Sequence, residues 1–219
     1  MGLELNEPPV RYNEFFGRYQ EQMPQLITAG RSPMTVADLM RRRLEVAGSN
    51  DPTLRSAWLD NYFDTSDAIV YHPSGKVKIV PDAPSLRECC AESELTDGAL
   101  RIDDAVYRSL AGLECRRDAI VASMNLTKRE VWESPVWQTL AGDNEYLLRA
   151  YTDFVFAEAH QRFDAIKNMA VYPRLPQPRP CMRAWIVYGV YDGSGLNGAS
   201  GLYDQESRLV GLLRTRAPE

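Results

Sequence analysis

Apolar residues recur at every third or fourth position in several stretches of this chain, which is the spacing of a helix with one buried face. The first such stretch spans 32–48, where Ser32-Pro33 places a capping side chain before a proline at the first helical position. Asp51-Pro52 begins a second, shorter helix in the same way. The longest predicted helix covers 144–168, and we expect most of 102–169 to be helical.

Other stretches are typical of β-strands. Residues 68–80 predict a hairpin, since lysines alternate with apolar residues after a Pro-containing turn at 72–75. Residues 184–190 are apolar on both alternating faces, as in a strand buried on both sides, and 207–213 have the same character.

Two strand-forming regions separated by a helical block predict a helix-rich α+β fold with a mostly antiparallel sheet. We expect residues 1–219 to form a single domain of this class. A proline-rich connector at 172–181 would carry the chain from the longest helix back to the sheet, because such a segment cannot stay helical. Residues 215–219 are expected to form a flexible tail.

The net charge of −5 is concentrated in one segment of the chain. Residues 82–104 contain seven acidic and two basic residues, so the remainder is neutral overall. Because no broad positive field results, the composition argues against nucleic acid as the main partner. The basic run Arg41–Arg43 is interpreted as a solvated helix face with one arginine stem lying along the surface.

Cysteine usage and hydropathy bear on the compartment. The four cysteines lack the spacing of a zinc site, which indicates reduced thiols. The N-terminal residues lack a signal-peptide pattern, and the longest apolar run, 184–191, is too short to cross a bilayer. These features predict a cytoplasmic protein with no membrane partner.

The stretch VYDGSGLNGASG at 190–201 contains the G-x-G-x-x-G spacing of a dinucleotide-binding turn. That turn requires a helix and a second strand after it, but only 21 of the 219 residues follow Gly198, so a dinucleotide site is excluded. An anion-binding nest of backbone N–H groups and a plain turn between strands stay open as interpretations. In either case 192–198 is predicted to form an exposed loop. The candidate ligand-binding residues are Asp192, Gly193, Ser194, Gly195, Asn197 and Gly198.

A second group of candidate residues is acidic. Asp60, Asp64 and Asp67 lie close in sequence and are followed by His72. Carboxylates and an imidazole can together hold a divalent ion that activates water. The same acids also fit ordinary roles as capping and turn residues, with His72 exposed in the hairpin turn.

No catalytic constellation is clearer than its structural alternative, so the leading prediction is a non-catalytic protein that binds a protein or a small molecule. One alternative is a metal-dependent hydrolase using Asp60, Asp64 and Asp67. The other is a binder of phosphorylated small molecules using the Gly-rich loop 192–200. The cofactor, the identity of the partner and the oligomeric state, including a homo-oligomer, stay open.

Overall fold

The computed structural model of the chain describes residues 2–7, 10–120, 126–160, 169–175 and 177–213. The predicted tail at 215–219 and the segment 161–168 of the longest predicted helix lie outside the described residues. No helix in the described part of the chain is long and apolar enough to cross a membrane.

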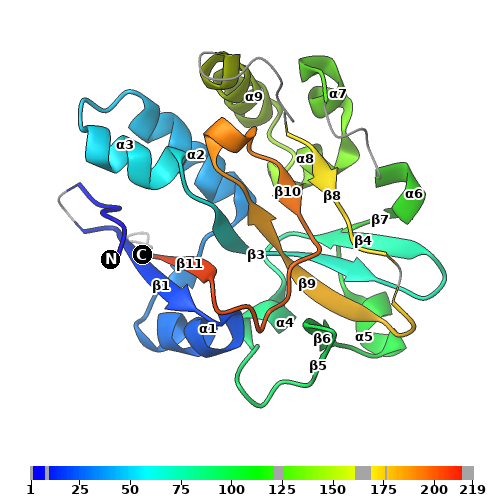
Figure 1. Cartoon of the computed structure of the whole chain (residues 1–219). Coiled ribbons are helices and arrows are strands. Elements are labelled where there is room, and N and C mark those ends of the chain that lie inside the picture. The colour runs from blue at the N-terminus through cyan, green and yellow to red at the C-terminus, as the bar shows by residue number, and fades with distance from the viewer. Residues whose placement is uncertain (1, 8–9, 121–125, 161–168, 176, 214–219) are drawn as a thin grey trace, which may run out of the picture.

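A large mixed sheet runs through the middle of the molecule (Figure 1). Its strands are β1 (Tyr12–Gly17), β2 (Ser32–Pro33), β3 (Phe63–Tyr71), β4 (Lys76–Val80), β5 (Leu95–Thr96), β6 (Ala99–Arg101), β7 (Leu113–Arg116), β8 (Val171–Tyr172), β9 (Cys181–Val187), β10 (Leu196–Asn197) and β11 (Ser207–Leu212). The main order is β1-β11-β3-β9-β10-β8, and β4 joins β3 to β7. Strands β3 and β9 are buried almost throughout, because helices cover both faces of the sheet at its centre.

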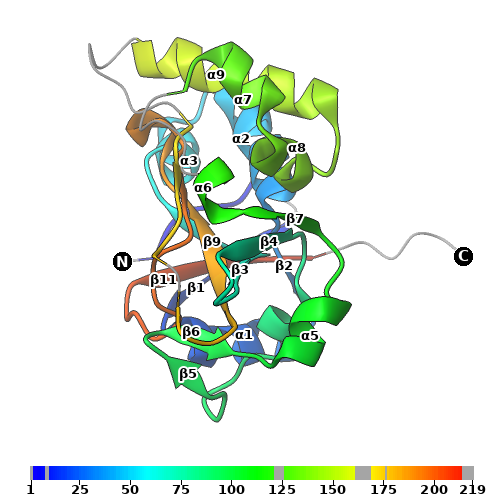
Figure 2. The same cartoon turned by 90° about the vertical axis from the view of Figure 1, so that its right-hand side faces the viewer.

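The helices form two groups, each packed on its own apolar cluster (Figure 2). The helices are α1 (Tyr19–Thr28), α2 (Val36–Ala47), α3 (Pro52–Leu59), α4 (Pro84–Arg87), α5 (Asp104–Ser109), α6 (Arg117–Ile120), α7 (Lys128–Glu133), α8 (Pro135–Leu140) and α9 (Glu145–His160), with a short 3₁₀ helix, η1 (Val190–Asp192). Helices α2, α3, α8 and α9 pack around the buried Trp58, Trp137 and Trp185. Helices α1 and α4 pack on the opposite face around Tyr19 and Met23.

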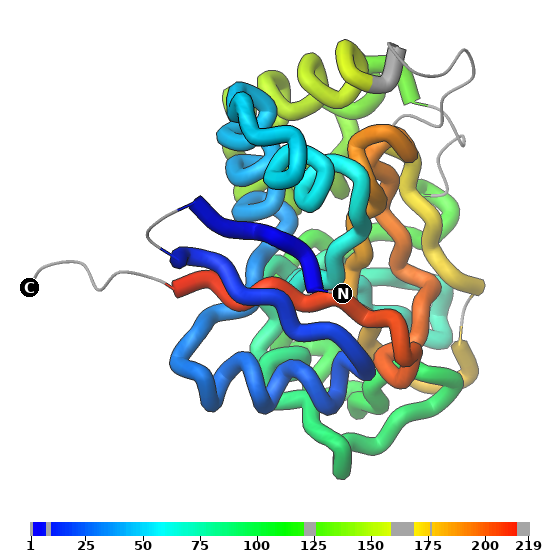
Figure 3. Tube along the Cα trace, turned by 60° about the vertical axis from the view of Figure 1, so that its left-hand side comes forward, coloured from blue at the N-terminus to red at the C-terminus, as the bar shows by residue number. Residues whose placement is uncertain are grey.

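The segments near the two ends of the chain lie side by side (Figure 3). Strand β1 runs antiparallel to β11, from Tyr12 opposite Leu212 to Gly17 opposite Ser207. Strand β11 in turn lies beside β3, so the C-terminal strand connects the first strand of the chain to the centre of the sheet.

The prediction of a mostly antiparallel sheet agrees with the structure, although the sheet, which has eleven strands in the described part of the chain, includes parallel pairs at β8–β10 and β3–β11. The hairpin at 68–80 is confirmed, with β3 paired to β4 from Ala68 opposite Val80 onward. The strands predicted at 184–190 and 207–213 correspond to β9 and β11. Strand β9 begins three residues earlier, at Cys181, and ends at Val187.

The helix predicted at 32–48 begins later than expected. Ser32–Pro33 forms β2 against β11, and α2 begins at Val36. The Thr35 side chain accepts a hydrogen bond from the Asp38 N–H, and the Asp38 carboxylate accepts one from the Thr35 N–H. This reciprocal cap satisfies two N–H groups of the first turn of α2, and the pairing of Ser32–Pro33 with β11 keeps those two residues out of the helix.

The block predicted to be helical at 102–169 contains a strand, β7, which corrects that expectation. Leu113 of β7 lies opposite Ile79 of β4. The chain approaches β4 closely just before this pair, since a Cβ at Gly112 would lie 2.3 Å from the carbonyl oxygen of Ile79. Residues 113–116 therefore form a strand and not a helix, because pairing with a strand that is distant in sequence outweighs the local helical preference.

Candidate functional site

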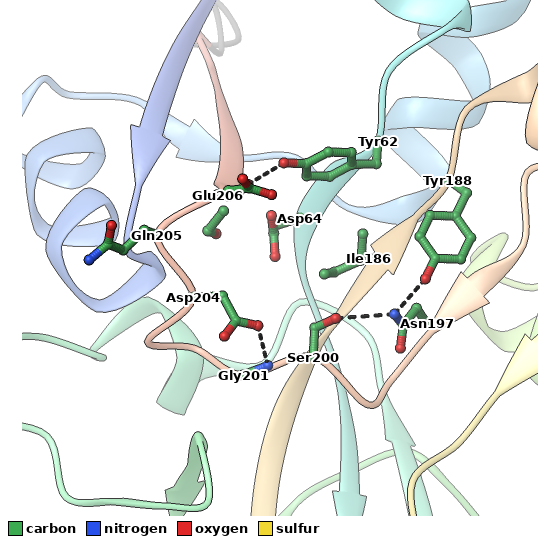
Figure 4. A pocket seen from close by; sticks show the side chains of 11 residues that line it. Tyr62, Asp64, Ile186, Tyr188, Asn197, Ser200, Gly201, Asp204, Gln205 and Glu206 are labelled. Carbon is green, nitrogen blue, oxygen red and sulfur yellow. Dashed lines mark hydrogen bonds between the residues drawn. The ribbon is translucent and has the colours of Figure 1, made fainter.

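The site begins at an irregularity in the central strand β3. This strand pairs with β9 at Asp64 and again from Ala68, with a shift of register between them. The polar residues of the irregular segment are satisfied internally, as when the Thr65 hydroxyl donates to the Trp185 carbonyl at 2.9 Å. Such bulges re-aim side chains, and Asp64 lies at the start of β3, between β9 and the loop that enters β11 (Figure 4).

A pocket of about 390 Å³ lies at this point, which is within the range of small-molecule sites. It is formed by the start of β3, the end of β9, β10 and the loop before β11 (Figure 4). The residues that line it are Tyr62, Asp64, Ile186, Tyr188, Asn197, Ser200, Gly201, Asp204, Gln205, Glu206 and Ser207.

Hydrogen bonds fix the wall of the pocket that Asn197 provides. The Asn197 amide nitrogen donates to the Tyr188 hydroxyl at 2.6 Å and to the Ser200 hydroxyl at 3.1 Å. Its side-chain oxygen accepts from the N–H of Ala199 at 2.7 Å. Asn197 therefore joins β9 to the loop, and its own hydrogen-bonding groups are largely satisfied inside the wall.

The opposite rim is more open. The Tyr62 hydroxyl donates to the backbone carbonyl of Glu206, and the Asp204 carboxylate accepts from the N–H of Gly201 at 2.8 Å. Asp204, Gln205 and Glu206 are exposed. Within the described residues, the side chains of Gln205 and Glu206 make no hydrogen bond or ion pair, so this rim presents polar groups to whatever enters the pocket.

Asp64 lies at the base of the pocket and is only 5% exposed. Its carboxylate accepts a hydrogen bond from the backbone N–H of Arg208 at 2.7 Å. Burial raises the pKa of Asp64 to about 6, although the hydrogen bond from the Arg208 N–H opposes the rise. Near neutral pH the base of the pocket therefore carries a carboxylate in an unfavourable, largely dry environment.

A fully buried arginine on β9, Arg183, fixes the loop 199–206 that borders the pocket. Arg183 donates to the carbonyl oxygens of Ala199 and Ser200 at 3.0 and 2.8 Å, and to the carbonyl of Asp97. Its guanidinium also lies 3.7 Å from the Asp97 carboxylate. These contacts fix the backbone of the loop and involve none of the side chains at 199–206.

A second buried arginine holds the segment before the loop. Arg43 of α2 donates to the carbonyl of Tyr188 and to the hydroxyls of Tyr151 and Ser194, at 2.9 to 3.1 Å. It also donates to the carbonyls at the end of α3, those of residues 58 and 61. The run Arg41–Arg43 is therefore not simply a solvated face, because Arg43 has no exposed surface and joins α2 and α9 to the turn after β9.

The glycine stretch is mostly buried, which corrects the exposed loop predicted at 192–198. Of these residues only Asp192 is exposed. Gly193 and Ser194 have φ values of +74° and +52°, which makes a tight turn after η1. The N–H groups of residues 193, 194, 196 and 198 donate to the carbonyls of residues 190, 189, 170 and 172.

These internal hydrogen bonds bear directly on the six predicted ligand-binding residues. An anion-binding nest needs free N–H donors, and four donors of this stretch are used inside the protein. Asn197 lies in the pocket, whereas Asp192, Gly193, Ser194, Gly195 and Gly198 are not among its lining residues. Gly198 has a packing role, since a Cβ there would lie 2.7 Å from the Ile69 side chain.

The three predicted metal ligands are not brought together either. Asp60 ends α3 at the surface, Asp64 lies in the pocket, and Asp67 accepts hydrogen bonds from two backbone N–H groups of neighbouring segments. His72, in the hairpin turn, interacts with Asp104. Across the described residues, no group of three or more histidine, cysteine or acidic side chains is placed to hold a metal ion.

Sequence reasoning named Asp64 as a metal ligand and Asn197 as a ligand-binding residue, and it placed Ser200 in the candidate loop 192–200. It named no other pocket residue as part of a site. The pocket joins residues from around 62–64, 186–188 and 197–207, which the topology alone brings together. The one available signal was the polar turn between two strand-like stretches at 204–207, because exposed loops on a rigid scaffold often carry binding residues.

Comparison with known proteins identifies the fold. No protein-family model and no curated protein sequence matches the chain. A solved structure described as accommodation of massive sequence variation in Nanoarchaeota by the C-type lectin fold matches with a TM-score of 0.67 and 16% sequence identity. The match covers 94% of this chain and 100% of the other. The chain is therefore similar to that structure in its fold, which is the C-type lectin fold.

Proposed function

We propose that this chain is a non-catalytic binding protein whose ligand occupies the pocket at the ends of β3 and β9. One observation carries the proposal. The loop 199–206 has its backbone held by Arg183, whereas its side chains at 204–206 are exposed with few internal contacts. Side chains placed in this way are free to contact a ligand without a cost to the fold.

The fold neighbour supports this interpretation. Its description attributes the accommodation of massive sequence variation to the C-type lectin fold. Accommodation of that kind requires a backbone that keeps its shape when surface side chains change. Arg43 and Arg183 would provide this property here, because most of their hydrogen bonds hold backbone carbonyls.

The chemistry of the pocket favours binding over hydrolysis. A serine nucleophile needs a base within hydrogen-bond reach. The hydroxyl of Ser200 accepts from the Asn197 amide, and no histidine is among the described residues that line the pocket. The Asp204 carboxylate is engaged by the Gly201 N–H.

Filling the pocket tests the proposal. Ser200→Trp places a large ring inside it, and Ser109→Trp adds the same ring at the exposed end of α5 as a control. Each protein is screened by NMR against one library of small polar and aromatic fragments. We expect some fragments to shift the 200–207 amide signals of the native protein and of the Ser109→Trp variant. The same fragments should leave these signals of the Ser200→Trp variant unchanged. Fragments that bind all three proteins alike, or none that reaches these amides, would contradict the proposal.

A further inference from the structure

The charged residues that line the pocket are all acidic. Asp64, Asp204 and Glu206 line it, and none of the eleven described residues that do so is basic. The nearest arginine in sequence, Arg208, contributes its backbone N–H to Asp64. The Arg208 guanidinium instead pairs with the Glu14 carboxylate at 2.8 Å, so its charge is already neutralised by another partner.

Asp64 distinguishes this pocket from an ordinary group of surface acids. The residue is only 5% exposed, yet within the described residues its carboxylate has no ion pair. A buried charge without a counter-charge destabilises the protein, and a cation brought next to it recovers much of that cost. The base of the pocket thus holds a buried negative charge for which the described residues provide no positive counter-charge.

We propose that the pocket receives the cationic side chain of a lysine or arginine presented by a protein partner, with Asp64 as its counter-charge. This inference rests on the proposed binding function. Asp204 and Glu206 at the rim add to the attraction for a positive group. The chain as a whole carries a net charge of −5, which favours the approach of a basic partner.

The remaining lining residues suit the rest of such a side chain. The half-buried Ile186 provides an apolar surface for the methylene stem of a lysine or arginine. Tyr188 brings an aromatic ring to one side of the pocket (Figure 4), and aromatic faces attract cations. The Tyr62 ring on another side already has the Arg208 guanidinium 5.6 Å from its centroid. The Gln205 side chain is free to bond to the backbone of the partner segment.

The test uses short blocked peptides of the form Gly-Ser-X-Ser-Gly, in which X is lysine, arginine, norleucine, glutamine or glutamate. Binding to the full chain is followed by NMR at the amides of 200–207. We expect the lysine or arginine peptide to bind at least about fivefold more tightly than the norleucine peptide, which has the stem without the charge. Asp64→Asn should abolish this preference. Asp118→Asn, which removes one charge from an exposed site on α6, should leave it within about twofold.

The other measurements distinguish a protein side chain from a free amine as the source of the cation. They also distinguish failure of the cationic specificity from failure of the proposed binding function. If butylamine or spermidine binds as tightly as the lysine peptide, the ligand is a free amine and the assignment to a protein side chain is wrong. If neutral or acidic peptides bind as well as the basic ones and Ser200→Trp blocks them, the pocket binds ligands but the cationic specificity is wrong. If basic peptides bind equally to the native, Asp64→Asn and Ser200→Trp proteins, their binding lies elsewhere and the inference is overturned. If no peptide or fragment perturbs the 200–207 amides, the proposed binding function itself fails.

Discussion

The segment from residue 188 to residue 206 consists of two regions that are held in place in different ways. The inner region, 188–198, is mostly buried, and its side chains and N–H groups take part in the internal hydrogen bonds. The outer region, 199–206, is fixed through its carbonyls and exposes the side chains of 203–206. The comparison teaches that the shape of the pocket depends on the identity of inner residues, whereas part of its chemistry depends on the exposed outer residues 204–206. Leu202 is the buried exception in the outer region.

Arg43 shows why the inner region is sensitive to sequence. A buried guanidinium needs its N–H groups satisfied, and Arg43 achieves this with three carbonyls and two hydroxyls rather than with a carboxylate. These acceptors come from the end of α3, from α9 and from residues 188 and 194. One side chain of α2 therefore joins three segments that are distant in sequence.

The largest effect should follow from loss of this arginine. Arg43→Met keeps a long apolar stem but leaves several buried carbonyls without donors, each at a cost of about 1–3 kcal/mol. We expect the free energy of unfolding to fall by about 3–5 kcal/mol in urea denaturation. Arg41→Met, on the exposed side of the same helix, should change it by less than about 0.5 kcal/mol. Equal effects of the two substitutions would show that Arg43 does not hold the inner region together.

A second test of the inner region is Gly198→Val. A Cβ at this position would lie 2.7 Å from the Ile69 side chain and 2.9 Å from the ring of Trp185, both in the core. Overpacking of this kind costs about 1–3 kcal/mol, and we expect the upper end because the tryptophan is fully buried. Gly48→Ala is the control, since its Cβ would have only one neighbour, at 3.9 Å. Thermal unfolding of the two variants measures the difference, and a native-like melting temperature for Gly198→Val would contradict the packing role.

Asp64 lies between the two regions and should make stability depend on pH. Burial raises the pKa of this carboxyl from its ordinary value of 3.8 to about 6, so the folded protein favours the protonated form. The resulting stabilisation is complete below about pH 4 and is lost as the pH rises through about 6. Asp64→Asn removes this loss. Its free energy of unfolding relative to the native protein should therefore increase from about pH 4 to about pH 7.

The size of this change is on the order of 2 kcal/mol, because one pKa unit corresponds to about 1.4 kcal/mol and relaxation of the pocket reduces the full amount. Asp67, whose pKa burial raises to about 7, is present in both proteins and cancels in the difference. Urea denaturation at several pH values provides the measurement. A difference that does not vary with pH would show that Asp64 is as well solvated in the folded as in the unfolded chain.

The elements that sequence predicted correctly are those specified by local pattern. The alternation in 68–80 and the apolar runs that became β9 and β11 depend on neighbouring residues, and Asp51 caps α3 as its type suggests. Strand β7 was missed because its pairing with β4, permitted by the close approach at Gly112, is a long-range contact.

The candidate site was harder to predict for the same reason. The three arginines at 41–43 are identical in type. Packing buries both Arg42 and Arg43, and only the contacts with α9 and the turn after β9 give Arg43 its role. The glycine spacing at 193–198 is explained by a tight turn and by close packing. Asp64 was singled out by its charge, but its role depends on the bulge in β3 and on residues more than a hundred positions away.

The smallest effect on stability is expected in the outer region, at Gln205 and Glu206. Their side chains are exposed and make no hydrogen bond or ion pair within the described residues, so Gln205→Ala and Glu206→Gln should each change the free energy of unfolding by less than about 0.5 kcal/mol. Combining them should remain nearly additive, because the backbone that carries them is held by Arg183 rather than by either side chain. The same double variant should alter fragment binding at the 200–207 amides, since both residues line the pocket. Urea denaturation and NMR titration of one protein preparation give both results. A large loss of stability would show that the outer side chains support the fold, and the distinction between the two regions would then be wrong.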